Sequence, residues 1–107
     1  MALGNYSSAS GNFATALASS SVASGDYAVA AGRTEATSLY QTAIGAYGLP
    51  GGDPHNWVAT DDLFTVANGQ SASAPSTAFV VKKNGNATLQ GVLTEAPGGD
   101  IPMYTGN

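Results

Sequence analysis

The side chains that could do chemistry in this sequence are few and widely separated. His55 is the only histidine, it lies in the Gly/Pro-rich segment LPGGDPHN (49–56), and the chain has no cysteine. A single histidine can bind a metal where three copies of a chain converge on a three-fold axis, but nothing in this sequence points to such a site. Without cysteine, no thiol nucleophile is available. The serines have no base at a spacing that indicates Ser-His-Asp chemistry. We therefore expect no catalytic residue and predict that the chain is not an enzyme.

The acidic residues suggest a cation, but their pattern does not define a site. Asp53, Asp61 and Asp62 are oxygen ligands of the kind that Ca²⁺ prefers. No EF-hand spacing is present, and a loop of solvated acids explains these residues equally well. A catalytic pair of glycosidase carboxylates is disfavoured, because adjacent side chains on a strand point to opposite faces. The segments GLPGG and GNATLQG also lack the lysine and the spacing of a phosphate-binding loop. We expect neither a metal ion nor a cofactor.

The charge of the chain restricts its partners. Arg33, Lys82 and Lys83 are the only basic side chains, and the formal net charge is -4. A chain with so few cations is a poor binder of phosphate backbones, so no nucleic-acid partner is expected. No apolar run reaches the length of a membrane-spanning helix, so we expect no membrane contact within this segment.

The elements that would position a functional surface come from a seven-residue repeat. Its units read NYSSASG (5–11), NFATALA (12–18), SSSVASG (19–25), DYAVAAG (26–32) and, after an irregular stretch RTEATS (33–38), LYQTAIG (39–45). Position five of the units is always alanine: Ala9, Ala16, Ala23, Ala30 and Ala43. Position seven is glycine in all but one unit: Gly11, Gly25, Gly32 and Gly45. Periodicity of this kind decides the fold before any other signal.

A coiled coil does not explain this repeat, and a β-structure does. A coiled coil needs large apolar residues at two seam positions, and a glycine in every unit would cost a helix about 1 kcal/mol each time. Positions four to six instead alternate as a short strand, which places alanine on one face and larger residues on the other. We predict coils of fourteen residues with two strands each, stacked ~4.8 Å apart. Alanine then faces a narrow interior, and glycine occupies a tight turn with positive φ.

Three units also resemble a known family. SSSVASG, DYAVAAG and LYQTAIG are similar to the head repeats of the YadA-like trimeric autotransporter adhesins, and related repeats occur in trimeric phage tail fibres. The resemblance covers residues 1–48 and implies an all-β fold, a trimeric left-handed parallel β-roll of seven-residue repeats. It also implies an extracellular location, either at a cell surface with an outer membrane-anchored parent or on a virion. The scarcity of large apolar residues agrees with a homotrimer, because small chains bury too little surface alone.

The second half of the chain has no repeat. We expect a Gly/Pro-rich loop at 49–62, a small β-hairpin module at 63–95 and an extended tail at 96–107. Within the module, strands 78–83 and 86–92 flank the hairpin turn, Asn84 and Gly85. Asn-Gly between β-rich segments predicts a type I′ turn in which both residues have positive φ.

An aromatic residue recurs at position two and supplies the candidate binding surface: Tyr6, Phe13, Tyr27, Tyr40 and, after the last unit, Tyr47. Exposed, these rings would form a row that grips a host-surface protein or a glycan, because tyrosine supplies contact area at low entropic cost. Alternatively they cover the roll or pack between subunits, and this packing role is preferred. The predicted function is a non-enzymatic trimeric fibre module that mediates adhesion or receptor attachment. The alternative is a structural shaft segment of a phage tail fibre that spaces a separate tip.

Overall fold

The computed structural model describes residues 1–94, so the extended tail predicted at 96–107 lies outside the described residues. The described part of the chain is all-β and contains no helix. Its strands are β1 (Ala2–Leu3), β2 (Ser8–Ala9), β3 (Thr15–Leu17), β4 (Val22–Ala23), β5 (Val29–Arg33), β6 (Glu35–Ala36), β7 (Thr42–Ala46), β8 (Asp62–Asn68), β9 (Thr77–Lys82) and β10 (Ala87–Leu89).

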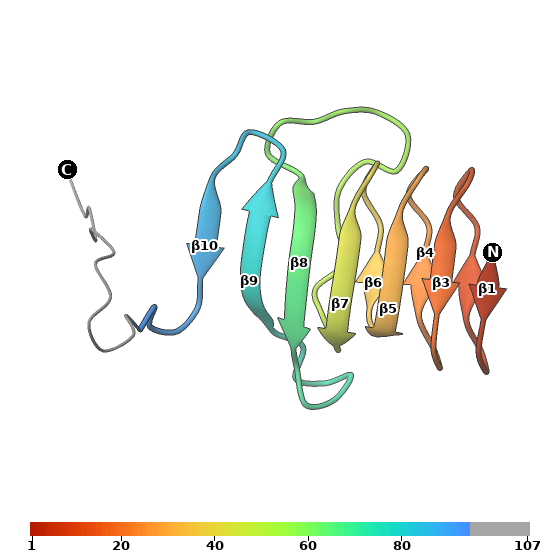
Figure 1. The fold of residues 1–107 in the computed structure, drawn as a ribbon, viewed down its shortest axis with the longest axis horizontal. Helices are drawn as coiled ribbons and strands as arrows, with labels where there is room; N and C mark the ends of the chain where they lie inside the picture. Colours follow the sequence, from red (N-terminus) through yellow and green to blue (C-terminus); the bar gives the residue numbers. More distant parts are fainter. Residues whose placement is uncertain (95–107) are drawn as a thin grey trace.

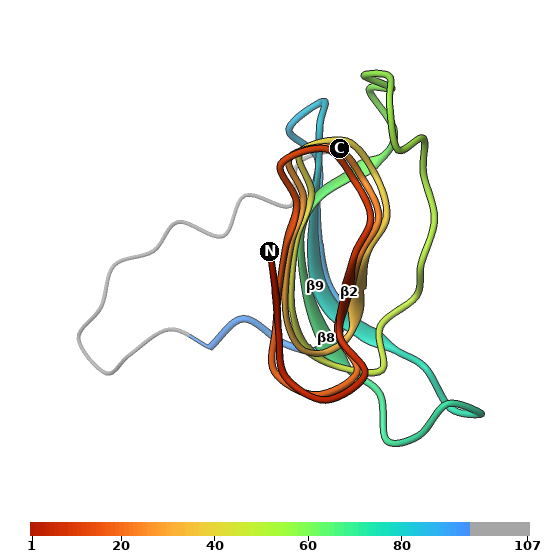
Figure 2. The ribbon, with the colours of Figure 1, turned by 90° about the vertical axis from the view of Figure 1, so that its right-hand side faces the viewer.

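The first seven strands form stacked coils of about three turns. Successive strands alternate between two sheets, so β1, β3, β5 and β7 are neighbours in sheet A while β2, β4 and β6 form sheet B. All pairs within this part are parallel, and the first coils pair residues 14 positions apart, as in Ala2↔Ala16 and Ala16↔Ala30. Figure 1 shows the strands following one another along the long axis, and Figure 2 shows the coils superimposed as a narrow loop. The predicted stack of two-stranded coils is confirmed.

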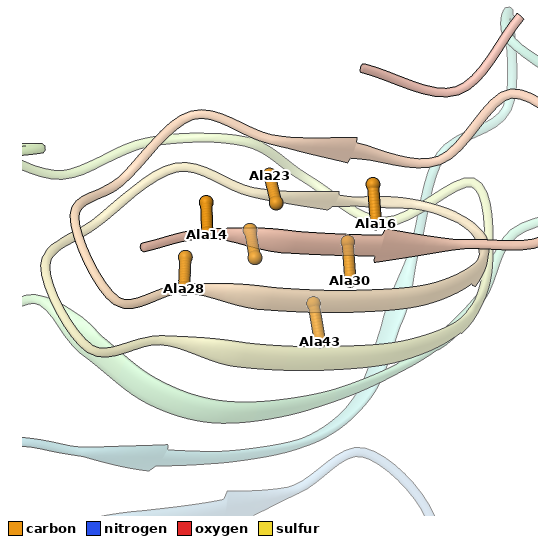
Figure 3. Packing of buried hydrophobic residues seen from close by; sticks show 7 residues of the cluster. Ala14, Ala16, Ala23, Ala28, Ala30 and Ala43 are labelled. Atoms are coloured by element: carbon orange, nitrogen blue, oxygen red, sulfur yellow. The ribbon is translucent and has the colours of Figure 1, made fainter. Parts of the chain in front are cut away.

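The interior of the roll is filled mainly by alanine methyl groups, together with a few buried polar side chains. The position-five residues Ala16, Ala23, Ala30 and Ala43 are fully buried, and Ala9 is partly buried. The alanines of the two sheets point into the same narrow space (Figure 3). Position three, which the sequence analysis did not assign, also faces inward: its residues Ala14, Ser21, Ala28, Thr34 and Gln41 are buried. The roll is narrow because both inward-facing positions carry small residues in every unit except 39–45, where position three is Gln41.

The stretch 33–38 is part of the roll, so its description as irregular is wrong. It contains β6, in which Glu35 pairs with Val22 and Ala36 pairs with Ala23 at position five. At its start, Arg33 pairs in sheet A with Ala46. Ala46 directly follows the unit 39–45, so both residues occupy position one of a unit. The unit therefore has every position except position two. The shortened unit keeps its strand because the missing residue belongs to the turn.

The expected role of glycine needs a correction. Gly32 and Gly45 have positive φ, but Gly11 and Gly25 do not. What the glycines share is closeness to the next coil: a Cβ on Gly11 would lie 2.1 Å from the carbonyl oxygen of Gly25. Ala18, which replaces glycine at position seven, also has positive φ (80°). Positive φ occurs in addition at position two of every complete unit, in Tyr6 (60°), Phe13 (57°), Ser20 (62°), Tyr27 (59°) and Tyr40 (62°). Glycine is thus required mainly because backbones approach closely between coils.

The second half extends sheet A. Strand β8 pairs in parallel with β7, then β9 and β10 add antiparallel neighbours, giving a 7-stranded sheet in the order β1-β3-β5-β7-β8-β9-β10. Within residues 1–94 sheet B ends at β6, so no strand of this part of the chain covers that side of the last coil. A buried polar cluster lies there: the Gln41 side chain donates to Thr65 Oγ1 (3.1 Å), and Lys83 Nζ donates to Ser38 Oγ (3.2 Å).

The predicted hairpin is present, with a different turn. Strands β9 and β10 pair antiparallel, with Leu89 opposite Phe79. Gly85 has a φ of +91°, but Asn84 does not have positive φ, so the turn is not type I′. Instead Gly85 N–H donates to the Lys82 carbonyl (2.8 Å), and Lys82 N–H donates to the Asn86 carbonyl (2.8 Å). This pattern is typical of a three-residue loop that ends in a glycine bulge.

Candidate functional site

The five predicted binding residues lie on two opposite edges of the roll. Each edge consists of the turns that lead from one sheet to the other (Figure 2). Phe13, Tyr27 and Tyr40 belong to turns from sheet B to sheet A, whereas Tyr6 and Tyr47 belong to turns that leave sheet A. The prediction of one shared surface is therefore wrong, because consecutive units alternate between the sheets.

Phe13, Tyr27 and Tyr40 form a stacked row, which we call the aromatic row. The ring centroids of Phe13 and Tyr27 are 5.2 Å apart and those of Tyr27 and Tyr40 are 5.0 Å apart, with interplanar angles of 13°. Trp57 continues the row edge-on, with its centroid 6.5 Å from that of Tyr40. The side chains remain open to solvent, since Phe13 is 80% exposed and Tyr40 48%.

The backbone fixes the spacing of this row. Tyr27 N–H donates to the Asn12 carbonyl at 2.7 Å, and Tyr40 N–H donates to the Asp26 carbonyl at 2.8 Å. Asn12 N–H also donates to the Asp26 carboxylate at 2.9 Å. Each ring thus sits at the same place in a turn that is bonded to the turn of the next coil. Ring separations of 5.0 and 5.2 Å are close to the ~4.8 Å spacing of paired strands, so the stacking follows from the roll.

The loop that carries Trp57 is held against the same edge by acidic residues. His55 Nδ1 lies 2.9 Å from Asp26 Oδ2, and this partner raises the pKa of the His55 imidazole. The same bond, helped by Asn12, lowers the pKa of the Asp26 carboxyl. Backbone N–H groups of His55 and Asn56 lower the pKa of Asp53. The only histidine therefore has a positioning role here: it joins the loop to the roll.

Lys83 supports the row from the hairpin side. Its Nζ lies 5.5 Å from the centroid of the Trp57 ring, an arrangement favourable for a cation–π interaction. Burial lowers the pKa of Lys83, while the carboxylates of Asp61, Asp62 and Asp53 counteract that shift. Sequence reasoning missed both Trp57 and Lys83. The available signal was the position of the single tryptophan next to the Gly/Pro-rich loop.

The acidic residues considered for calcium have other partners. Asp61 Oδ2 accepts a hydrogen bond from Asp53 N–H (2.7 Å), and Asp62 forms an ion pair with Lys82 (3.3 Å). Within residues 1–94, no group of three or more His, Asp or Glu side chains is arranged to hold a metal ion. The same residues include no helix long and apolar enough to cross a membrane.

The opposite edge is less regular. Tyr6 is 90% exposed, and Ser20 takes the equivalent place in the next coil. Tyr47 is half-buried, and its hydroxyl accepts a hydrogen bond from Arg33 Nη1 (2.7 Å). Comparison of the chain with known proteins gives no match to a family model, a curated protein or a solved structure.

Proposed function

We propose that this chain is a non-enzymatic module of a trimeric fibre that attaches to a host-surface protein or glycan. The observation that carries the proposal is the aromatic row: three stacked rings and Trp57, exposed along one edge of the roll. Hydrogen bonds between turns fix the rings before any ligand arrives, so binding loses little conformational freedom. Rigid aromatic side chains of this kind supply much of the contact area in protein recognition surfaces.

The outer face of sheet A supports assembly with copies of the same chain. The strand registers align one row of outward-facing side chains across the whole sheet: Leu3, Leu17, Ala31, Ile44, Val66, Phe79 and Leu89. A second row consists of Thr15, Val29, Thr42, Phe64, Val81 and Ala87. Contiguous apolar surface of this extent is typical of an interface.

The outer face of sheet B is different. Its strands direct Ser8, Val22 and Glu35 outward, and Ser24 follows in the same orientation. The contrast between the two faces favours one role for each: sheet A packs against copies of this chain, and sheet B faces solvent. In the proposed assembly, three left-handed rolls meet through their A sheets, and their aromatic rows remain outside.

Attachment is tested with variants that keep the turns intact. Ser20 has the same positive φ as the rings, so Tyr27→Ser and Tyr40→Ser are compatible with the backbone. We expect both variants to lose binding to immobilised uncharged glycans and host-surface proteins, while Tyr6→Ser on the opposite edge keeps it. Equal binding by all of these variants would remove the row as the attachment surface. If the unaltered protein binds none of the probes, the alternative function, a structural shaft, is favoured over attachment.

Assembly is tested separately by light scattering. A trimer has three times the 10.6 kDa mass of the chain. Ile44→Asp, on the outer face of sheet A, should dissociate it, whereas Val22→Asp on the outer face of sheet B should not. A monomer in the unaltered protein at micromolar concentration would contradict the proposed trimer.

A further inference from the structure

The shortened unit leaves a hollow at the edge opposite the aromatic row. On that edge the turns carry Tyr6, then Ser20, and later Tyr47, but the unit 33–38 has no position-two residue between Ser20 and Tyr47. A pocket of about 560 Å³ lies there, within the size range of small-molecule sites. The residues of its lining that bear on recognition are Ser20, Arg33, Glu35, Tyr47, Pro50 and Pro75.

Arg33 is the distinctive group of this pocket. Among the three side-chain cations, Lys82 is paired with Asp62 and Lys83 is buried, whereas Arg33 is exposed. No carboxylate oxygen of the described residues lies within 4.0 Å of its guanidinium. Its orientation is nevertheless fixed, because Nη1 donates to the Tyr47 hydroxyl at 2.7 Å and Cζ lies 5.7 Å from the Tyr47 ring centroid. The remaining N–H groups can bind a carboxylate in the forked geometry of arginine.

The other walls define the rest of the ligand. Glu35 lines the same pocket without pairing with Arg33, and its carboxylate can only accept hydrogen bonds. Ser20 offers a hydroxyl, while Pro50 and Pro75 offer apolar surface. A ligand that fits these walls has a carboxylate at one end, hydroxyl donors at the other and C–H groups between them.

We infer that the pocket binds an acidic saccharide, with the sugar carboxylate on Arg33 and its hydroxyl groups on Glu35 and Ser20. This site is separate from the aromatic row and does not depend on it. It gives the roll a second recognition surface with a defined chemistry, at the one place where its repeat is incomplete.

The test is a calorimetric titration of the full chain, in its assembled state, with sodium D-glucuronate, D-glucose and sodium acetate. We expect glucuronate to bind more tightly than either of the others. Arg33→Gln should weaken glucuronate binding about 10-fold or more, because it removes a charge-assisted hydrogen bond. Glu35→Gln should weaken it as well, and Tyr47→Phe, which removes the hydroxyl that orients Arg33, should have a smaller effect. Tyr27→Ser should not change it.

Three outcomes would overturn the assignment. Acetate binding equal to glucuronate binding would show a simple anion site, and glucose binding equal to glucuronate binding would remove the role of Arg33. If the titration with glucuronate gives no heat of binding, an acidic saccharide is excluded as the ligand of this pocket. Circular dichroism of Arg33→Gln and Glu35→Gln separates loss of binding from loss of fold. Because Tyr27→Ser affects only the aromatic row, a failed pocket and a failed attachment surface give different results.

Discussion

Replacing one interior alanine by leucine tests the architecture of the roll most directly. Ala23 is fully buried in sheet B, between Ala9 and Ala36 of the neighbouring strands. Across the interior it meets the alanines of sheet A, so the three additional carbon atoms of Ala23→Leu have no free space (Figure 3). Overpacking of a tight core costs ~1–3 kcal/mol, and a methyl-sized site belongs at the upper end, about 3 kcal/mol per chain.

The matched control for this change is the next residue. Ser24 is half-buried on the outer face of sheet B, so Ser24→Leu adds a larger side chain outside the closed interior. For a domain of this size, 3 kcal/mol lowers the melting temperature by about 12–24 °C. Thermal unfolding followed by circular dichroism at one fixed protein concentration measures both variants, since self-association would otherwise shift the midpoint. If Ala23→Leu melts together with Ser24→Leu, the alanines do not fill a closed interior and the reasoning fails.

Three further changes test the turns and the pH dependence. Gly25→Ala would bring a Cβ to 2.2 Å from a main-chain carbonyl oxygen of the next coil. We therefore expect urea unfolding to show a free energy of unfolding lower by about 2–3 kcal/mol. A urea midpoint equal to that of the unaltered protein would contradict this close contact. Gly85→Val places a β-branched residue at a φ of +91° in open space, so we expect it to destabilise the hairpin. Gly91→Val is the control, because Gly91 also lies in open space but does not have positive φ. Identical hydrogen exchange of the hairpin amides in both variants would refute the glycine bulge. His55 should titrate by NMR above 6.5, and Asp26→Asn should lower that pKa, because the carboxylate favours the protonated imidazole. The stabilisation from this pair is complete only between the unperturbed values of the two groups, above pH 3.8 for Asp26 and below pH 6.5 for His55. It is lost as the pH rises through the folded-state pKa of His55 and as the pH falls through the lowered pKa of Asp26. A titration midpoint of His55 that is unchanged in Asp26→Asn would exclude the pair.

Much of the roll was predictable because its signal repeats. The invariant alanine and the alternation around it indicate a strand with a methyl-sized interior, and the structure buries Ala16, Ala23, Ala30 and Ala43. The division of the aromatic residues between two edges was also contained in the sequence. Two strands per coil place consecutive position-two residues on opposite edges, and the prediction of one surface overlooked this consequence.

The turn geometry was not predictable from local preferences. Positive φ is rare outside glycine, so the sequence points to glycine as the residue that turns the chain. In the structure Tyr27 and Tyr40 adopt that conformation, and each N–H donates to the preceding coil. Stacking between coils, which no single unit reveals, compensates for the local strain.

The remaining differences arise from contacts between distant segments. Asn84 and Gly85 are compatible with either a two-residue or a three-residue loop. The three-residue loop includes Lys83, which reaches the roll and donates to Ser38. Likewise, Trp57 joins the aromatic row through its loop and not through the repeat, so no periodic signal points to it.

The flat coils of this roll have a consequence for how far the protein can extend. One coil uses 14 residues and advances the structure by the spacing of one strand, ~4.8 Å. The same number of residues in an α-helix would span about 21 Å. Per residue, the roll is therefore about four times shorter than a helical stalk, while every coil adds one turn to each of its two edges. A chain built in this way gains lateral surface far faster than distance, which favours the display of side chains over the spacing of a remote tip.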